Sequence, residues 1–257
     1  MNHHRQGVGK PLLLVHGLGG SRRSWDPIVD ALAASRELIL VDLPGHGATP
    51  AEEDSGAFAG LSRSLEAWLD ANGLAGVDMV GSSMGARLVL EMARRGRAGA
   101  VVSLDPGGFW AGWERRWVST TLGASAAALR LLGPAIRPLA HTAAGRTALL
   151  AQLSARPWAL DGDFVERELV GIVATPTFDA LVADLAYGAP QAGPAHPDTG
   201  PVTIGWGSHD RLCLPSQSIR AQAAFPSARL HAFGGSGHFP MWDEPDKAAA
   251  LIGRAVN

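Results

Sequence analysis

The chain alternates short apolar runs with longer segments of helical periodicity. Six runs of five or six residues are rich in Val, Ile and Leu, and Gly, Pro or Asp bound most of them. Continuous apolar runs of this length are typical of strands that are buried on both faces of a parallel sheet. The predicted strands are residues 11–15, 37–41, 77–81, 100–104, 201–206 and 228–233.

Helical patterns separate the first predicted strands. One pattern follows Ser24, which we expect to be its N-cap, with Pro27 in the first turn. A second pattern, over residues 61–73, ends on an Asn-Gly pair, and a third occupies residues 84–96. This alternation favours an α/β fold, with a mostly parallel central sheet flanked by helices and joined by right-handed crossovers.

The alternation stops in the middle of the chain. From Pro106 to Gly200 no convincing strand pattern occurs, and the last of several helical patterns follows the pair Thr175-Pro176, expected to be a cap and a first helical residue. The helical patterns cover roughly residues 110–132, 145–156, 161–173 and 176–187. We therefore predict a core formed by residues 1–105 and 200–257, with residues 106–199 inserted as a helical lid. Such a lid would cover the carboxyl edge of the sheet, where open α/β sheets bind ligands.

The sequence GSSMG, residues 81–85, lies between a predicted strand and a predicted helix. It fits the pattern G-x-S-x-G with Ser83 at the centre, whereas centring on Ser82 would put Val80 at the first glycine position. On such a turn the serine hydroxyl projects from the sheet edge, and the glycines remove side chains that would clash. We therefore predict that Ser83 is a nucleophile.

A serine nucleophile needs a base, and the base needs an acid that orients it. The loops after the last two predicted strands supply Asp210, in GSHDRLCLP, and His238, in GGSGHFPMWDEP. The chain order Ser, Asp, His is the one expected for this motif. We predict a Ser83–His238–Asp210 triad, with Asp105 at the end of another predicted strand as an alternative acid.

Acyl transfer also needs N–H donors for an oxyanion. We predict the backbone N–H groups of Met84, just after the nucleophile, and of Leu18, in the glycine-rich loop at residues 16–21. This loop fails the dinucleotide pattern G-x-G-x-x-G because Arg22 stands at its sixth position. The sequence shows no P-loop and no spaced group of metal ligands, so we predict no cofactor and no metal.

Composition narrows the choice of partners. The formal net charge is −2 with scattered charges, which argues against a nucleic-acid partner. Cys213 is the only cysteine, so an intrachain disulfide is impossible and a small buried hydrophobe is the simpler interpretation. Arginines and prolines interrupt the most membrane-like stretch, residues 121–140, and the first ten residues hold no apolar run. We expect a cytoplasmic protein that acts on a small molecule and has no membrane partner.

Five segments together resemble the signature loops of the α/β-hydrolase superfamily. They are HGLGGSRRSWDPI, VDLPGHGATP, GSSMGA, GSHDRLCLP and GSGHFPMWDEP, and they cover about residues 11–105 and 200–256. The resemblance implies a serine hydrolase that works through an acyl-enzyme, here a carboxylesterase for small to medium apolar substrates. Members of the superfamily usually begin with an antiparallel hairpin, of which HHRQGVGKP resembles only the last part.

Two questions stay open at this point. The lid tryptophans either pack the lid onto the core or line an apolar substrate pocket, and the pocket candidates are Trp110, Trp113, Trp117 and Trp158. GSSMGARL and DLPGHG also resemble 2-succinyl-6-hydroxy-2,4-cyclohexadiene-1-carboxylate synthase, a C–C lyase of the menaquinone pathway. That resemblance implies a polyanionic substrate and several arginines in the pocket, among them the motif residue Arg87. A C–C hydrolase, a perhydrolase or haloperoxidase, and a ligand-binding protein of low turnover are the remaining alternatives.

Overall fold

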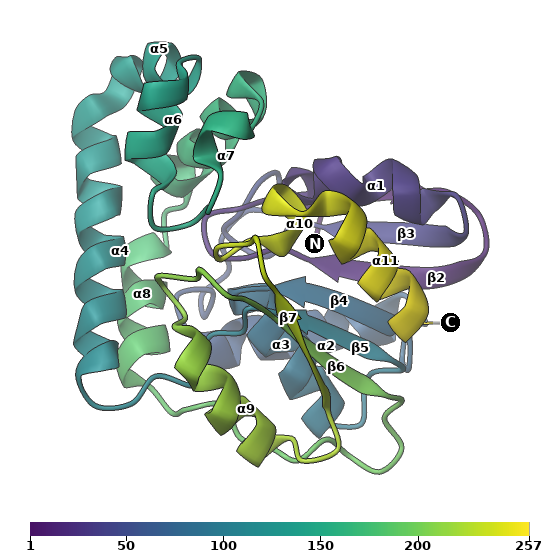
Figure 1. Ribbon diagram of the computed structural model, residues 1–257. Helices are drawn as coiled ribbons and strands as arrows, with labels where there is room; N and C mark the ends of the chain where they lie inside the picture. The colour runs from purple at the N-terminus through teal and green to yellow at the C-terminus, as the bar shows by residue number, and fades with distance from the viewer. Residues whose placement is uncertain (257) are drawn as a thin grey trace.

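A seven-stranded sheet forms the centre of the molecule in the computed structural model, which describes residues 1–256 (Figure 1). The strand order is β1-β3-β2-β4-β5-β6-β7, and only the edge pair β1·β3 is antiparallel. The strands are β1 (His3–Gln6), β2 (Lys10–Val15), β3 (Arg36–Val41), β4 (Asp78–Ser82), β5 (Val101–Leu104), β6 (Val202–Gly207) and β7 (Arg229–Phe233). The predicted mostly parallel sheet is confirmed, and β1 is an additional strand that the apolar pattern did not predict.

Helices cover both faces of the sheet because its strands alternate their side chains between two apolar layers. Leu12 and Leu14 of β2 pack into a buried cluster with residues of α1 and α11, whereas Leu13 and Val15 pack with α2 and α3. The helices of the core are α1 (Asp26–Ala33), α2 (Phe58–Ala71), α3 (Met84–Arg94), α9 (Ser218–Ala224), α10 (Pro240–Asp243) and α11 (Pro245–Ala255). The four strand residues are fully buried, which explains the uninterrupted apolar run in the sequence.

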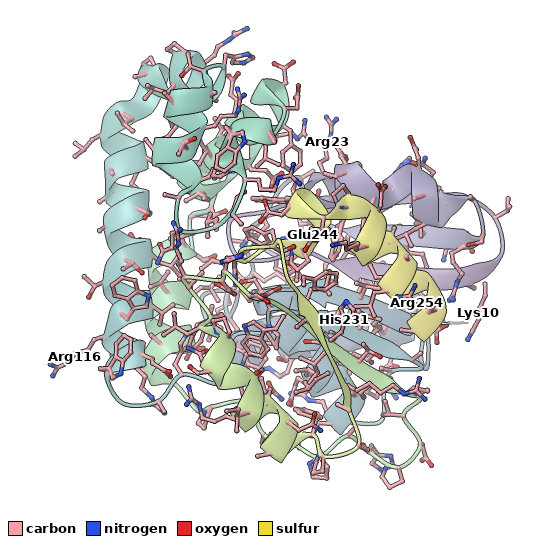
Figure 2. The ribbon with its side chains drawn as sticks, in the orientation of Figure 1. Lys10, Arg23, Arg116, His231, Glu244 and Arg254 are labelled. Atoms are coloured by element: carbon pink, nitrogen blue, oxygen red, sulfur yellow. The ribbon has the colours of Figure 1, made fainter. Side chains whose placement is uncertain are left out.

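A group of helices follows β5 and precedes β6, and it stands to one side of the sheet (Figure 1). Its helices are α4 (Trp113–Leu132), α5 (Ile136–Ala140), α6 (Ala143–Leu150), α7 (Gly162–Ala174) and α8 (Phe178–Tyr187). Figure 2 shows Arg116 projecting away from α4, on the side that faces away from the core. We call residues 106–199 the lid.

Two predicted helix starts are wrong in detail. Ser24 lies inside a short 3₁₀ helix, Arg22–Trp25, and forms a capping box with Ser21, while α1 begins only at Asp26. Thr175 ends α7 by donating a hydrogen bond from its Oγ1 to the carbonyl of Gly171 (2.8 Å), and α8 begins at Phe178. In both places the hydroxyl side chain bonds to the backbone of the preceding turn or helix instead of capping the helix that follows. A Ser or Thr before a helical pattern is compatible with either arrangement.

Within residues 1–256, no single helix has the length and apolar character needed to cross a bilayer, although α7 and α8, bent by 83° at their junction, meet that test as a pair on length and composition only.

Candidate functional site

Ser83 lies at a sharp turn between the end of β4 and the start of α3. Its backbone has φ 57° and ψ −115°, which is an uncommon conformation for a residue with a side chain. A Cβ atom at Gly81 would lie 2.2 Å from the carbonyl oxygen of Gly85, and a Cβ at Gly85 would lie 2.2 Å from that of Val15. The two glycines therefore permit the close packing that holds Ser83 in this strained turn.

The structure brings Ser83, His238 and Asp210 into one hydrogen-bonded chain. Ser83 Oγ lies 2.8 Å from His238 Nε2, and His238 Nδ1 lies 2.7 Å from Asp210 Oδ2. Ser83 comes from the turn after β4, Asp210 from the loop after β6 and His238 from the loop after β7. The three predicted triad residues thus meet at the carboxyl edge of the sheet, in an arrangement that can activate a serine hydroxyl.

Backbone hydrogen bonds hold the acid and the base in place. Asp210 Oδ1 accepts the N–H groups of Leu212 (2.7 Å) and Cys213 (2.9 Å), which leaves Oδ2 directed at the histidine. The N–H of His238 donates to the carbonyl of Leu153 in the lid (2.8 Å). The lid therefore contributes directly to the position of the base.

Asp243 connects the loop that carries His238 to the lid. Its Oδ2 accepts the N–H of Gly237 (2.7 Å) and the N–H of Ala155 (2.9 Å), and its Oδ1 accepts a hydrogen bond from Ser154 Oγ (2.5 Å). Gly237 precedes the base in the loop after β7, whereas Ser154 and Ala155 belong to the lid. The carboxylate replaces water as the acceptor for these buried donors, so the lid and the catalytic loop are joined at a shared polar group.

Asp105, the alternative acid, is fully buried at the end of β5. Its Oδ1 accepts the N–H of Gly207 (2.8 Å), and its φ of 49° is again unusual for a residue with a side chain. Burial and the neighbouring charge of Asp210 raise the pKa of Asp105 well above its ordinary value. The acid that contacts the histidine is therefore Asp210, and Asp105 lies beside it as a buried group whose charged form is disfavoured.

The two predicted oxyanion donors lie beside Ser83. Met84 opens α3, and a Cβ on Gly17 would lie 3.0 Å from the Cβ of Ser83, so the loop that carries Leu18 passes close to the nucleophile. Within residues 1–256, neither the Leu18 N–H nor the Met84 N–H donates a hydrogen bond inside the protein. Free N–H groups next to a nucleophile can stabilise an oxyanion.

The histidines of the HG and DLPGHG segments are structural. His16 Nε2 accepts the N–H of Leu43 (3.0 Å), so its Nδ1 carries the proton and donates to the carbonyl of Gly17 (2.7 Å). Burial lowers the pKa of His16, and burial together with His16 lowers that of His46 to about 3. Both rings therefore stay neutral and shape the loops around the site.

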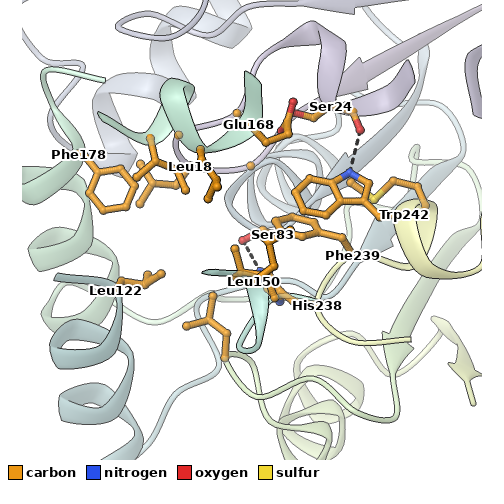
Figure 3. Close-up of a pocket in the computed structure, with 18 residues that line it drawn as sticks. Leu18, Ser24, Ser83, Leu122, Leu150, Glu168, Phe178, His238, Phe239 and Trp242 are labelled. Carbon is orange, nitrogen blue, oxygen red and sulfur yellow. Dashed lines mark hydrogen bonds between the residues drawn. The ribbon is translucent and has the colours of Figure 1, made fainter. Parts of the chain in front are cut away.

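An apolar cavity of about 60 Å³ opens onto Ser83 and His238 (Figure 3). Its apolar lining comes from the lid, from the loops after β2 and β6, and from the loop that contains His238 and the short helix α10: Leu18, Leu122, Leu150, Leu153, Leu169, Ile172, Phe178, Leu212, Phe239, Met241 and Trp242. The sequence could not single these residues out, because a lining leucine or phenylalanine has the same periodicity as one packed in the core.

The predicted tryptophan pocket is wrong. Trp113, Trp117 and Trp158 are exposed by 64%, 41% and 53%, and none of the four candidates lines the cavity. Trp110 precedes α4 and is buried in the core. Trp117 Nε1 donates to the carbonyl of Arg211 (2.9 Å), so this side chain ties α4 to the loop that carries Asp210.

Two polar side chains that the sequence analysis did not select also line the cavity. They are Glu168, on α7, and Ser24, in the short 3₁₀ helix before α1. Glu168 sits at a buried position of a helix otherwise lined by Phe164, Val165 and Leu169. A carboxylate on the otherwise apolar face of a predicted helix is unusual, and this feature of the sequence could have identified Glu168 as a candidate.

Two groups of side chains have the spacing of metal ligands. Asp210, Cys213 and His238 form one, but Asp210 and His238 already share a hydrogen bond, and burial raises the pKa of the Cys213 thiol well above its ordinary value. A protonated thiol is a poor metal ligand, and Cys213 is the small buried residue that the sequence predicted. The second group, His141, Asp163 and Glu166, lies at the surface of the lid.

Comparisons with known proteins agree with the fold. A family model described as alpha/beta hydrolase fold matches residues 10–245. An uncharacterized protein of Mycobacterium tuberculosis is 27% identical over 98% of this chain and 76% of its own length. A 2-succinyl-6-hydroxy-2,4-cyclohexadiene-1-carboxylate synthase of Yersinia pseudotuberculosis is 39% identical over 36% of this chain and 33% of its own. Among solved structures, a thermophilic esterase from Thermogutta terrifontis superposes with a TM-score of 0.76 at 19% identity, covering 98% of this chain and 91% of that one.

Proposed function

This chain belongs to the alpha/beta hydrolase family, and on that premise we propose that it is a serine esterase that cleaves small to medium apolar carboxylic esters. The observation that carries the proposal is the hydrogen-bonded chain from Ser83 through His238 to Asp210, which opens onto an apolar cavity. Acyl transfer is the chemistry for which such a chain is suited.

Ser83 Oγ attacks the ester carbonyl while His238 Nε2 takes its proton. Asp210 holds the imidazole with its Nδ1 proton directed at the carboxylate, and it stabilises the imidazolium that forms. His238 then gives the proton to the departing alcohol, which leaves an acyl group on Ser83. A water molecule, deprotonated by His238 in the same way, attacks the acyl-enzyme and releases the carboxylic acid.

The negative charge on the carbonyl oxygen develops beside the turn at Ser83. The N–H groups of Leu18 and Met84 are the donors for this oxygen in our proposal, and the start of α3 adds a favourable dipole. Loss of one such donor typically lowers kcat by a factor of about 10²–10³.

The lining of the cavity supports an apolar acyl group and argues against a polyanionic substrate. Among residues 1–256, no lysine or arginine lines the cavity. Arg87, the arginine shared with the synthase motif, stacks on the ring of Phe58 at 3.8 Å and donates to the carbonyl of Ala189 (2.5 Å). Its guanidinium thus packs α3 against the end of the lid and does not reach the cavity. We therefore favour the esterase over the C–C lyase, which would need arginines in its pocket.

The first test is the hydrolysis of p-nitrophenyl acetate, butanoate, hexanoate and octanoate by wild type, Ser83→Ala and Ser82→Ala. Ser82 is the matched control, because it is buried in β4 next to the nucleophile and its Oγ has no hydrogen-bond partner among residues 1–256. We expect Ser83→Ala to lose activity by a factor of about 10⁴ or more and Ser82→Ala to keep it within about threefold. An active Ser83→Ala, or a wild type inert on all four esters, would refute the proposal.

A further inference from the structure

The cavity contains a second polar group, apart from the triad. Figure 3 shows Glu168 and Ser24 together on one side of the cavity, and Ser83 and His238 on the other, with the rings of Phe239 and Trp242 between them. The rest of the lining is apolar apart from backbone groups. A substrate bound at Ser83 can therefore place one end near Glu168.

Glu168 has an unused hydrogen-bonding atom. The residue is only 6% exposed, and its Oε2 accepts a hydrogen bond from Ser24 Oγ at 2.6 Å. Among residues 1–256, no group in the protein bonds to its Oε1, which is also buried. A buried oxygen without a partner destabilises a fold, so such an atom in a ligand cavity indicates a partner that arrives with the ligand.

The environment of Glu168 keeps both of its protonation states accessible. Burial raises the pKa of Glu168 to about 7, while the hydrogen bond from Ser24 and the charge of Arg167 oppose that rise. Asp26 and Arg23 act in opposite directions on the same group, the first raising and the second lowering its pKa. Near neutral pH the side chain is thus both a donor, as the acid, and an acceptor, as the carboxylate.

A hydroxyl group suits such a partner best. It accepts a hydrogen bond from the neutral acid and donates one to the carboxylate, whereas a ketone serves only the first state and an ammonium only the second. Burial of an ammonium in this apolar cavity would also carry a large desolvation penalty. We infer that Glu168 binds a hydroxyl group on the acyl chain of the substrate, so that the preferred substrates are esters of hydroxylated carboxylic acids.

The inference rests on the proposed esterase function, and it assigns the acyl side because the acyl group takes part in both steps, whereas the alcohol departs in the first. A purely structural role is the competing interpretation. The Ser24–Glu168 hydrogen bond joins the lid to the core, and Arg167 on the same helix pairs with Asp26 of α1 at 2.8 Å. A tether of this kind changes stability but does not discriminate between substrates.

The test compares methyl esters that differ only by a hydroxyl in place of a methyl group. The pairs are methyl 3-hydroxybutanoate with methyl 3-methylbutanoate, and methyl 6-hydroxyhexanoate with methyl heptanoate, with hydrolysis followed by alkali consumption at constant pH 7. The enzymes are wild type, Glu168→Gln, which keeps the hydrogen-bonding capacity, and Glu168→Met, which keeps the length but removes it. The measured quantity is the ratio of kcat/KM for the hydroxylated ester to that for its methyl counterpart.

We expect Glu168→Met to lower this ratio by about tenfold or more for at least one pair, and Glu168→Gln to keep it within about threefold. A ratio that Glu168→Met leaves unchanged for both pairs would overturn the inference in favour of the tether. A preference of the wild type for methyl 6-aminohexanoate over the hydroxylated ester would overturn it in favour of a cation site.

Failure of the inference and failure of the esterase proposal give different results. If the wild type hydrolyses the unsubstituted esters but shows no effect of Glu168→Met on the ratio, only the inference fails. If the wild type hydrolyses no ester, the esterase proposal fails, and calorimetry decides the role of Glu168. The measured quantity is then the ratio of the affinity for the hydroxylated ester to that for its methyl counterpart. This ratio should be about tenfold higher for Ser83→Ala than for Ser83→Ala/Glu168→Met, and equal ratios would overturn the inference.

Discussion

Replacement of Glu168 by Gln should stabilise the protein at alkaline pH and have little effect in acid. Gln has the same shape as Glu and keeps a hydrogen-bonding carbonyl for Ser24, but it does not ionise. Burial raises the pKa of Glu168 from its ordinary value of 4.5 to about 7. Between these pH values the unfolded chain has lost the proton that the folded chain keeps, so the free energy of unfolding falls as the pH rises.

The size of the effect follows from the two pKa values. At about 1.4 kcal/mol per pH unit, full ionisation of Glu168 destabilises the folded state by about 3 kcal/mol at pH 8. At pH 5 the same group destabilises the folded state by only about 1 kcal/mol, because this pH lies barely above the ordinary pKa, at which the unfolded chain begins to lose the proton that the folded chain keeps. The stability difference between Glu168→Gln and wild type should therefore grow by about 2 kcal/mol from pH 5 to pH 8, or about 5 °C in Tm.

Urea unfolding followed by tryptophan fluorescence measures this difference at each pH. Glu53→Gln serves as the matched control, because Glu53 is exposed and the same change there should stay within about 0.5 kcal/mol. The comparison between variants removes the contribution of all other titrating groups, which both proteins share. A Glu168→Gln variant with the same stability difference at pH 5 and pH 8 would refute the assignment of a raised pKa to Glu168.

Three further predictions test the geometry of the site. Gly85→Ala should lower the free energy of unfolding by about 2–3 kcal/mol in urea, since its Cβ would lie 2.2 Å from a backbone oxygen of β2; a loss below about 0.5 kcal/mol would contradict the packing. Ile172→Trp should fill the cavity and lower kcat/KM for octanoate relative to acetate about tenfold, while Trp113→Ala, on the exposed face of the lid, should leave that ratio within about twofold. Asp210→Asn should lower kcat by about 10⁴ and Asp105→Asn by less than about tenfold, because Asp210 contacts His238 whereas burial raises the pKa of Asp105 well above its ordinary value; equal losses would remove the distinction between the two acids.

Features with a strict local cause could be predicted from the sequence. The six apolar runs coincide with β2 to β7 within one or two residues, and β2 to β6 are largely buried as the pattern predicts, whereas β7, at the edge of the sheet, is mostly exposed. Ser83, Asp210 and His238 were found because each follows a strand of the parallel sheet, and the carboxyl ends of such strands meet at one edge. The edge strand His3–Gln6 was missed since it is exposed and polar, and only its pairing with β3 makes it a strand.

Features that depend on how the lid sits on the core could not be predicted. Trp113 and Trp117 lie one turn apart on α4, as their spacing requires, but periodicity does not say which face of a helix meets the core. Glu168 and Ser24 are 144 positions apart in the chain, and no local pattern relates them. The residues that line the cavity therefore depend on how the lid packs on the core, whereas Ser83, Asp210 and His238 each follow a strand that the sequence already predicts.

If the proposed triad is correct, the lid helps to position it as well as to cover it. The N–H of His238 donates to the carbonyl of Leu153, and Asp243 joins Gly237 to Ala155, so the loop that carries the base is hydrogen-bonded to lid backbone on both sides. The same segment lines the cavity through Leu153. Because a misplacement of about 1 Å in a catalytic group can lower the rate about 10²-fold, a change that shifts this segment should alter kcat as well as KM. Residues on the outer face of α4 make none of these contacts, so their substitution should leave kcat unchanged. The effect of a substitution on kcat therefore distinguishes the part of the lid that positions His238 from the rest of the lid.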